Sequence, residues 1–555
     1  MKKGLMIMLG AAVLGTVCCS NMTADKVSAK TSGDYKYVVT GKKKKTCAIR
    51  KYTGKEKDVT VPDKLDGYTV TRIGNQAFKS NKNIKSVKLP KHITVIGNYS
   101  FSKCSNLESI TLSPKVHTIK WNAFSSCKKL KNLSLSSTLK KIGNYAFSNC
   151  RSLQDIKLPD SVETIGFNAF RGCKLTSIYI PKDLGETDLS SVFELGSVTK
   201  ITVADGNKYY DSRDNCNAII ETATNRLILA TNDSSIPDSI SAIGSGAFSG
   251  CDAIKEIIIP ASVTTIEFDA FYGCSGLEKV NLPKGLKTIG SEAFCKCSSL
   301  KEIKIPDSVS AIGSEAFSGC EAIKEITIPA SVSSIEDSTF YSCSGLEKVD
   351  LSEGLSSIGN EAFSCCTSLK EIRLPDSVET IGEDAFYDCS KIENIYIPKN
   401  LGETDLPLVF DCESAAKITV ADGNKFYDSR NNCNAVIEKD SDTLALACKN
   451  TLIPNSVKII DKNAFLNTPS EITVPEGVEI IYDFAFIGND SLKTVTLPVS
   501  LTELGDDAFD CSMETINYRG SKKQWEMIKT AIKETDGNEC DDEMYHIKIN
   551  YNYQG

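Results

Sequence analysis

Residues 298–320 read SSLKEIKIPDSVSAIGSEAFSGC, and variants of this 23-residue unit recur through most of the 555-residue chain. The phenylalanine of an Ala-Phe dipeptide, or of a variant of it such as Ser-Phe, Thr-Phe or Val-Phe, marks each copy. It stands at positions 78, 101, 124, 147, 170 and 193, then at 248, 271, 294, 317, 340, 363 and 386, and finally at 410, 465, 486 and 509. Self-similarity at a fixed period of about 20 to 50 residues is typical of repeat architectures. We therefore interpret the chain as an array of stacked units.

The first half of the unit predicts a short strand. Leu300, Ile303 and Ile305 follow the pattern L-x-x-I-x-I, whose last apolar residues lie on one face of an extended chain. Pro306 ends this strand, because proline has no N–H group to donate to a sheet.

The second half predicts a turn that returns the chain to the core. Val309 and Ile312 form a second apolar stretch, and Gly313 permits a change of direction. Residues 314–317 begin with a serine that can cap a helix, so we expect a single helical or 3₁₀ turn there. The phenylalanine of that turn and Cys320, three residues later, are expected to point inward.

One unit cannot bury these apolar residues by itself, whereas stacked units bury them in a continuous core. The fold predicted for residues 61–515 is therefore an α/β repeat solenoid, right-handed, with short parallel strands and single helical turns.

Two longer segments interrupt the period. The string ITVADGNKYYDSRDNCNAIIE from Ile201 recurs as ITVADGNKFYDSRNNCNAVIE from Ile418, a shift of 217 residues. We predict insert modules near 201–235 and 418–452, hairpin-like because they combine strand formers with Asx and Gly turn residues.

The recurring pattern L-x-x-I-x-[IL]-P-x-S-V-x-x-I-G-x-x-A-F-x-x-C resembles the BspA-type leucine-rich repeat family. The segments YDSRDNCNAII and INYRGSKKQWEMI also resemble segments common in bacterial members. The resemblance implies a solenoid of leucine-rich repeats of about 23 residues. It also implies a secreted or surface protein that takes part in adhesion or binds host or cell-surface proteins.

The N-terminus predicts a signal peptide over residues 1–29. Two lysines precede an apolar run of 13 residues that begins at Leu5, and small residues lead to a cleavage site after Ala29. A lipoprotein anchored through Cys18 or Cys19 is the alternative, which is less favoured because a valine precedes the first cysteine.

Both ends of the array need polar caps. We assign the N-terminal cap to residues 30–60 and the C-terminal cap to residues 516–555. In the C-terminal cap we expect an amphipathic helix near Gln524 to Ile532 and a closing strand in HIKINYNY.

The chain has 22 cysteines, and half of them lie three residues after a marker phenylalanine. Stacked neighbours point in parallel, whereas a disulfide needs facing side chains, so we predict buried free thiols. Zinc is the alternative, but neither Cys295-x-Cys297 nor Cys365-Cys366 supplies a tetrahedral ligand set.

The sequence gives little support for catalysis. It contains no phosphate-binding loop, dinucleotide-binding glycine motif, H-E-x-x-H or G-x-S-x-G string. Asp205 to Asn215 suggests calcium, but its oxygen residues are irregularly spaced and turn formation is the favoured interpretation. We predict a protein that is not an enzyme, without metal or cofactor.

Charge is unevenly distributed along the chain. Residues 35–165 contain 26 Lys and Arg but 8 Asp and Glu, whereas the whole chain has a net charge of −7. This mild overall acidity argues against a nucleic-acid partner. Lys42, Lys43, Lys44 and Lys45 head the basic region and form a candidate anchor to anionic envelope polymers or acidic glycans.

The residue between the last two apolar positions of each strand should point outward. This row forms a candidate partner-binding strip, because solenoids bind ligands on such faces. The candidate contact residues on this strip are Lys88, Lys157, Tyr179, Lys304, Arg373 and Tyr396.

Two functions follow from these observations. The first is a secreted or cell-surface scaffold, without catalysis, for protein binding or adhesion to extracellular or host surface proteins. The alternative is a structural envelope-associated protein docked through its basic N-terminal region. In both, the mature chain is expected to be a monomer without a transmembrane segment.

Overall fold

The computed structural model describes residues 28–410, 414–509, 512–535 and 547–554. The chain forms two compact units. The first comprises Met1–Lys174 with Asp183–Thr187 and Ser191–Phe193, and the second Leu175–Lys182, Asp188–Ser190 and Glu194–Gly555. The predicted signal peptide and its cysteines lie almost wholly outside the described residues.

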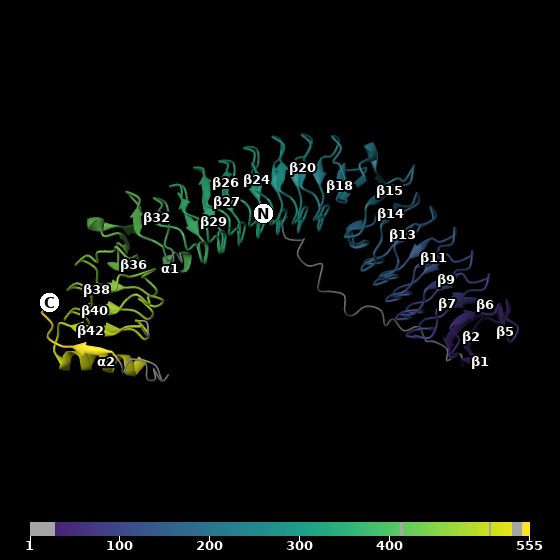
Figure 1. The fold of residues 1–555 in the computed structure, drawn as a ribbon, viewed down its shortest axis with the longest axis horizontal. Coiled ribbons are helices and arrows are strands. Elements are labelled where there is room, and N and C mark those ends of the chain that lie inside the picture. Colours follow the sequence, from purple (N-terminus) through teal and green to yellow (C-terminus); the bar gives the residue numbers. More distant parts are fainter. Residues whose placement is uncertain (1–27, 411–413, 510–511, 536–546, 555) are drawn as a thin grey trace. The chain divides into compact units, whose positions relative to one another are not determined.

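The first unit contains two sheets (Figure 1). The larger sheet has the order β1-β2-β3-β6-β8-β10-β12-β13, with β5 paired to β6, and the smaller has the order β11-β9-β7-β4. The strands are β1 Lys30–Ser32, β2 Tyr35–Gly41, β3 Thr46–Tyr52, β4 Asp58–Thr60, β5 Lys64–Leu65, β6 Tyr68–Ile73, β7 Ser86–Lys88, β8 Val95–Ile96, β9 Ser109–Thr111, β10 Thr118–Ile119, β11 Asn132–Ser134, β12 Lys141–Ile142 and β13 Thr164–Ile165.

The second unit repeats the plan in several shorter sheets. Their orders are β14-β15, β16-β17-β18-β19-β21-β23-β25, β20-β22-β24, β26-β28-β30, β27-β29-β31, β32-β33, β34-β35-β36-β37-β39-β41 and β38-β40-β42-β43. The strands are β14 Ser177–Ile180, β15 Lys200–Val203, β16 Tyr210–Asp211, β17 Ile219–Glu221, β18 Arg226–Leu229, β19 Ala242–Ile243, β20 Glu256–Ile258, β21 Thr265–Ile266, β22 Lys279–Asn281, β23 Thr288–Ile289, β24 Glu302–Ile303, β25 Ala311–Ile312, β26 Glu325–Ile328, β27 Ser334–Ile335, β28 Lys348–Leu351, β29 Ser357–Ile358, β30 Glu371–Ile372, β31 Thr380–Ile381, β32 Asn394–Ile397, β33 Lys417–Val420, β34 Tyr427–Asp428, β35 Ala435–Glu438, β36 Thr443–Ala447, β37 Ile459–Ile460, β38 Glu471–Thr473, β39 Ile480–Ile481, β40 Thr494–Leu497, β41 Glu503–Leu504, β42 Thr515–Tyr518 and β43 Lys548–Asn550.

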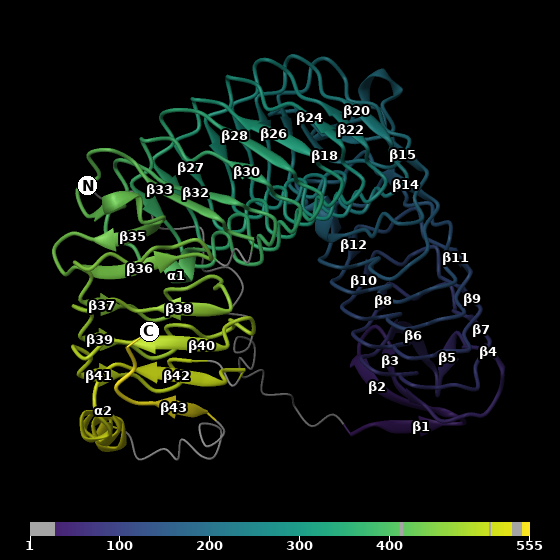
Figure 2. The ribbon, with the colours of Figure 1, turned by 60° about the vertical axis from the view of Figure 1, so that its left-hand side comes forward.

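Most repeats supply two short parallel strands, which join two separate ladders (Figure 2). Val280 of β22 pairs with Ile257 and Ile303, and Ile289 of β23 pairs with Ile266 and Ile312. Each partner is 23 residues away, so the period of the sequence is also the register of the sheets. The predicted solenoid of short parallel strands is confirmed.

The segment around each Ala-Phe dipeptide forms a third line of contacts between repeats. The N–H of Phe317 donates to the carbonyl of Thr339 in the next repeat at 2.9 Å, and the N–H of Phe340 donates to that of Ala362 at 2.8 Å. Glu315 and Gly319 have φ of 56° and 71°, in the left-handed region. A helix needs an unbroken right-handed run with bonds inside the segment, which this pattern prevents.

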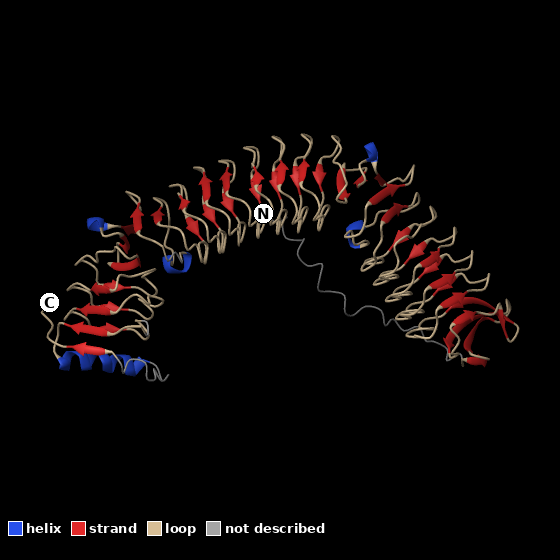
Figure 3. Cartoon of the chain, viewed as in Figure 1, coloured by secondary structure: helices blue, strands red, loops and turns tan. Residues whose placement is uncertain are grey.

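The predicted α/β class and its single helical turns are therefore wrong. The repeats form a β-solenoid with little helix, and the predicted segment 314–317 is a non-helical turn (Figure 3). The helices in the described residues are α1 Leu406–Val409, α2 Lys522–Thr535 and the 3₁₀ turns η1 Leu189–Ser191, η2 Arg213–Asn215 and η3 Arg430–Asn432.

The marker phenylalanines form the centre of the core. Phe317 is fully buried between Phe294 and Phe340, with ring centroids 5.5 Å apart on both sides and planes tilted by 4°. The same near-parallel stacking joins Phe101, Phe124 and the phenylalanines that follow them in the first unit. Parallel, offset rings at this distance are an attractive arrangement, worth about 0.5–1.5 kcal/mol per pair beyond burial.

The eleven cysteines that follow the marker phenylalanines are all buried free thiols, as predicted. Each also has a polar role that the sequence did not indicate. The thiol of Cys127 donates to the carbonyl of Phe101 at 3.1 Å, and that of Cys320 donates to Phe294 at 3.2 Å. Each thiol thus links its repeat to the one before it.

The inserts contain the antiparallel pairs expected of hairpins. In the first, β16, β17 and β18 pair antiparallel in turn, and β18 joins the parallel ladder through β19. In the second, β34, β35 and β36 pair in the same way, and β36 joins β37. The hairpin prediction is confirmed.

At the ends of the chain, β1 to β3 pair antiparallel, and β43 pairs with β42 in parallel. The predicted C-terminal helix is present as α2, which contains residues 524–532, and the predicted closing strand is present as β43.

Replacement of Phe317 by alanine should lower the free energy of unfolding of its unit by about 3–5 kcal/mol, because the cavity lies inside the ring stack. Urea unfolding followed by circular dichroism measures this change. Phe268→Ser provides the control, because Phe268 is 48% exposed. Equal stability of Phe317→Ala and the wild type would show that the ring is not a core anchor.

The buried thiols should make stability depend on alkaline pH. Burial raises the pKa of Cys104, Cys251 and Cys343 to about 12. In the unfolded chain a thiol titrates near about 8.5, so their contribution is complete below that pH and is lost as pH rises toward 12. At about pH 10 the free energy of unfolding should have fallen by up to about 2 kcal/mol per thiol.

Urea unfolding at about pH 8 and pH 10 measures this loss, and a variant with these three cysteines changed to alanine should lose less stability. Thiol titration after denaturation without reductant should find most of the eleven free. An identical pH dependence in wild type and variant, or nearly complete oxidation, would contradict the thiol ladder.

Candidate interaction surfaces

The structure places the six residues of the predicted strip on the strand face of their repeats. Lys88, Lys157, Lys304 and Arg373 are exposed, and Tyr179 and Tyr396 are partly buried. Lys88 and Lys157 belong to the first unit and the other four to the second. Within a sheet the strip is in register, as Lys88 pairs with Thr111. Between sheets it is interrupted, because Lys157, Lys304 and Arg373 lie outside the strands.

One tyrosine of the strip, Tyr396, is held by its surroundings. The hydroxyl of Tyr396 donates to the Asp376 carboxylate at 2.8 Å, and burial with this bond raises the pKa of Tyr396 to about 12. The same bond, with the backbone N–H of Lys399, lowers the pKa of Asp376. Tyr396 is therefore oriented in advance and is partly exposed to solvent.

The predicted basic anchor is the tip of a hairpin. Lys42 to Lys45 connect β2 to β3, and all four side chains are exposed. The tip is a tight turn, closed by a bond from the N–H of Lys45 to the carbonyl of Lys42, and Lys45 has a φ of 45°. Four adjacent ammonium groups on a tight turn produce a local positive field.

Four consecutive repeats of the first unit carry an aromatic residue at the turn before the marker phenylalanine. We call Tyr99, Trp121, Tyr145 and Phe167 the aromatic row. Trp121 is 47% and Phe167 50% exposed. The rings of Tyr99 and Trp121 lie 5.1 Å apart, those of Tyr145 and Phe167 lie 5.6 Å apart, and the Lys79 ammonium is 4.9 Å from the Tyr99 ring.

The fold itself does not require aromatic residues in this row. The position that Trp121 and Phe167 occupy holds Ser291, Ser314 and Asn360 in repeats of the second unit, where Phe268 is an isolated aromatic exception. The backbone hydrogen bonds are nevertheless the same. The N–H of Asn122 donates to the carbonyl of Asn144, and the N–H of Glu315 donates to the carbonyl of Asp337 in the equivalent way. An exposed aromatic residue where polar ones fold equally well indicates a contact surface.

Several turns of the second unit carry an acidic residue at the position that Tyr99 and Tyr145 occupy in the first. Burial raises the pKa of Asp269 to about 6, and the negative charges of Glu292 and Glu315 add to this shift. Ligand atoms of Glu292, Cys295 and Glu315 lie within 4.8 Å of one another. Burial raises the pKa of Cys295 to about 11, so this thiol is protonated at neutral pH and is a weak metal ligand. The cluster does not assign a metal site.

The segment considered for calcium is occupied by internal contacts. The guanidinium of Arg213 donates to both oxygens of Asp211, at 2.9 and 2.6 Å, beside the 3₁₀ turn η2. The second insert repeats the pair as Arg430 with Asp428. The turn interpretation agrees with this geometry.

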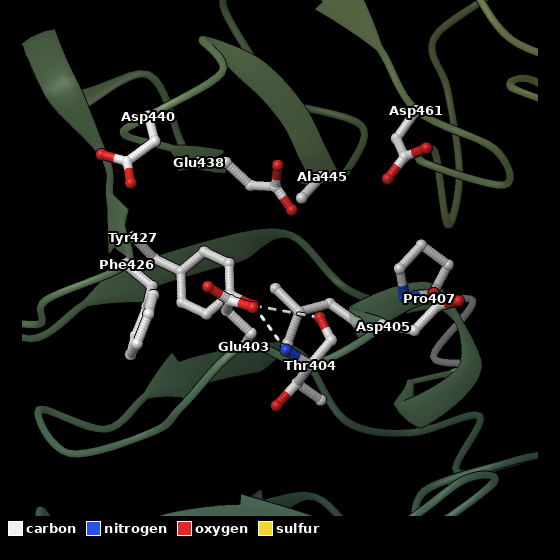
Figure 4. Close-up of a pocket in the computed structure, with 11 residues that line it drawn as sticks. Glu403, Thr404, Asp405, Pro407, Phe426, Tyr427, Glu438, Asp440, Ala445 and Asp461 are labelled. Carbon is white, nitrogen blue, oxygen red and sulfur yellow. Dashed lines mark hydrogen bonds between the residues drawn. The ribbon is translucent and has the colours of Figure 1, made fainter.

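The second insert borders a cavity of about 600 Å³ that sequence reasoning missed (Figure 4). Five carboxylates face it, and with them we define the acidic pocket. They are Glu403, Asp405, Glu438, Asp440 and Asp461. Tyr427 forms part of the wall, and its hydroxyl donates to the carbonyl of Thr404 at 3.0 Å and accepts the Thr404 N–H at 2.8 Å.

Both missed features had a signal in the sequence. An alignment of the repeats shows aromatic residues at 99, 121, 145 and 167, in four consecutive repeats, where most other repeats are polar. An alignment of the two inserts shows that Asp440 and Asp461 replace Ala223 and Gly244, and that Thr443 replaces Arg226. The differences between copies locate the surfaces, whereas the shared pattern describes the core.

The family model described as "BspA type Leucine rich repeat region (6 copies)" matches residues 71–206, 228–347, 333–435 and 445–529, well over half of the chain. Proteins of this type are typically secreted or surface-located and bind other proteins, and their fold is typically not catalytic. No curated protein matches the chain.

Several solved structures are similar to the chain. A leucine-rich cell surface protein from Faecalibacterium prausnitzii is 28% identical, with a TM-score of 0.47, and the match covers 59% of this chain and 96% of that one. The pneumococcal vaccine antigen PcpA is 21% identical, with a TM-score of 0.48 and coverage of 64% and 94%. A leucine-rich repeat protein from Bacteroides ovatus is 22% identical, with a TM-score of 0.38 and coverage of 94% and 99%. The family assignment rests on the repeat match.

Among the described residues, no helix combines the length and the hydrophobicity that crossing a membrane requires.

Proposed function

Because this chain belongs to the BspA-type leucine-rich repeat family, we propose that it is a secreted or cell-surface scaffold that binds other proteins and catalyses no reaction. The family supports protein binding in general. The aromatic row supports a particular surface for it, and this row is the observation that carries the proposal.

The aromatic row has the composition of an interface centre. Trp121 and Phe167 expose about half of their surfaces, although burying an aromatic ring is favourable. Tryptophan and tyrosine are the residues most often found at interface positions that dominate affinity. Lysines such as Lys79 and Lys103 lie on the same turns and would supply a polar rim.

The strip on the strand face is the second surface of this proposal. Arg373 and Tyr396 lie on neighbouring repeats of the second unit, and the hydroxyl of Tyr396 is already fixed by Asp376. Side chains that are ordered before binding lose less entropy when a partner binds. The signal peptide predicted over residues 1–29 supports export of the protein to the surface.

The double variant Trp121→Ser, Phe167→Ser tests the aromatic row. Serine occupies the same position in other repeats, so the variant should fold. We expect affinity for an extracellular protein partner to fall by about 30-fold or more, as when an aromatic hot spot is lost. Biolayer interferometry against a panel of extracellular matrix and mucosal proteins identifies the partner and measures the loss.

Phe268→Ser is the matched control, because it removes an equally exposed ring from a repeat of the second unit. Affinity should not change in this control. If a partner binds the double variant as tightly as the wild type, the aromatic row is not the binding surface.

A second function is favoured by the exposed lysines of the hairpin tip. We propose, as the alternative, that the basic first unit docks the protein on anionic polymers of its own cell envelope. The excess of Lys and Arg over residues 35–165 and the exposure of Lys42 to Lys45 support it. Such attraction is long-range and is screened by salt.

If this alternative holds, retention of the protein on envelope polymers should fall steeply between about 0.1 M and 1 M salt, as the Debye length decreases from about 10 to 3 Å. Changing Lys42 to Lys45 to glutamine should weaken retention at low salt, as measured by co-sedimentation with purified envelope. The control changes four exposed lysines of the second unit to glutamine, namely Lys284, Lys287, Lys417 and Lys449. Equal retention of both variants would contradict a role for the hairpin tip.

A further inference from the structure

The acidic pocket concentrates negative charge without a cation to balance it. None of its five carboxylates pairs with a lysine or arginine of the described chain within 4 Å. Neither of the two nearest lysines in sequence forms an ion pair with the pocket, but the backbone N–H of Lys462 donates to the Asp461 carboxylate at 2.8 Å and the charge of Lys462 acts to lower the pKa of Asp461. Lys439 donates to the backbone carbonyl of Asn424, and Lys462 lies 3.4 Å from Asp483.

The carboxylates influence one another across the cavity. The pKa of Asp461 is raised, chiefly by burial and in addition by the charge of Asp405. Burial raises the pKa of Tyr427 to about 12, and the charges of Glu438, Glu403 and Asp405 add to the effect. Repulsion among these groups disfavours the folded state unless a cation is present.

The first insert has an arginine side chain at the equivalent position. It is the duplicate of the second insert, and its strand β18 begins with Arg226, which pairs with Ala242 as Thr443 pairs with Ile459. The guanidinium of Arg226 donates from Nε to Glu267 at 2.6 Å. Its pKa is raised chiefly by this bond, and also by the charges of Glu221 and Asp188.

Glu221 and Asp188 are the counterparts of Glu438 and Asp405. In the first copy one of these acidic residues, Glu221, pairs directly with Arg226 across β17 and β18, so an internal guanidinium lies beside it. This observation is independent of the charge cluster, because it comes from the other copy.

The guanidinium lies where the second copy has a carboxylate. A Cβ placed on Gly244 would be 3.1 Å from Cζ and Nε of Arg226. The counterpart of Gly244 is Asp461, which borders the pocket. In the second copy Thr443 removes the internal guanidinium, and Asp440 and Asp461 add two carboxylates around the vacated place.

We propose that the acidic pocket binds the guanidinium group of an arginine side chain that a partner protein presents. The inference rests on the proposed function in that the arginine comes from a bound protein. A cavity of about 600 Å³ holds a side chain of this size, and the planar guanidinium pairs with several carboxylates at once. The ring of Tyr427 lines the same cavity.

Calorimetric titration of the full chain at low salt with N-acetyl-arginine amide tests the proposal without any partner. We expect saturable binding with a Kd on the order of 1 mM, and none of the neutral analogue N-acetyl-citrulline amide. Asp461→Gly, which restores the residue of the first copy, should weaken binding by about 10- to 100-fold, as expected for one charge-assisted hydrogen bond.

Thr443→Arg restores the internal guanidinium of the first copy. It should abolish binding of the probe and raise the melting temperature, because the new internal guanidinium would occupy the pocket and neutralise its negative charge. If this variant does not fold, Asp461→Gly and Asp405→Asn decide the question. Glu471→Gln is the control, since it removes one exposed carboxylate outside the pocket and should leave binding unchanged.

The proposal is overturned if the arginine probe does not saturate, if the citrulline probe binds equally, or if Thr443→Arg folds and still binds the probe. Calcium binding that Asp461→Gly abolishes, without arginine binding, would make the pocket a metal site and would also overturn it. These outcomes are separate from the proposed function, which fails when the aromatic-row variant keeps its affinity for the partner.

Discussion

Hydrogen bonds between successive repeats are the interaction on which the rest of each unit depends. The carbonyl of Phe294 accepts the N–H of Cys297 in its own repeat and the thiol of Cys320 in the next one. Each repeat thus completes the hydrogen bonding of its neighbour, and the phenylalanine rings stack only when both are in register. A fixed 23-residue spacing is the consequence, because a shift of one residue would move every inward side chain outward.

This dependence also explains residues that are unfavourable by themselves. Glu315 and Lys103 adopt φ of 56° and 62°, which costs about 1 kcal/mol or more for a residue other than glycine. The left-handed conformation orients the adjacent N–H groups toward the next repeat, as when Lys103 donates to Ser125 at 2.8 Å. The bond between repeats offsets the local strain, so the side chain at these positions is free to vary.

The core and the strands could be predicted from the sequence because both follow the period. The turn was predicted as helical because Ser314 to Phe317 resembles a capped helix start. Local propensity cannot account for the hydrogen bonds that the turn makes to the next repeat, and these bonds determine its conformation. The strip could be placed on a face, but its breaks and the bond from Tyr396 to Asp376 depend on neighbouring repeats. Surfaces such as the aromatic row consist of residues that differ between repeats, so a consensus pattern of the repeats does not include them.

Duplication explains how a structural scaffold acquires a binding site without disturbing its core. In the first insert, Arg226 pairs with Glu267 and is attracted by Glu221 and Asp188, so the acidic positions have an internal cation. In the second insert the strands keep the same pairing while Thr443 replaces that arginine. Stability from the parallel ladders is shared by both copies, so loss of one internal ion pair is tolerated. Two acidic positions that lie near the guanidinium in the first copy, those of Asp188 and Glu221, recur as Asp405 and Glu438, which are then available to an external cation.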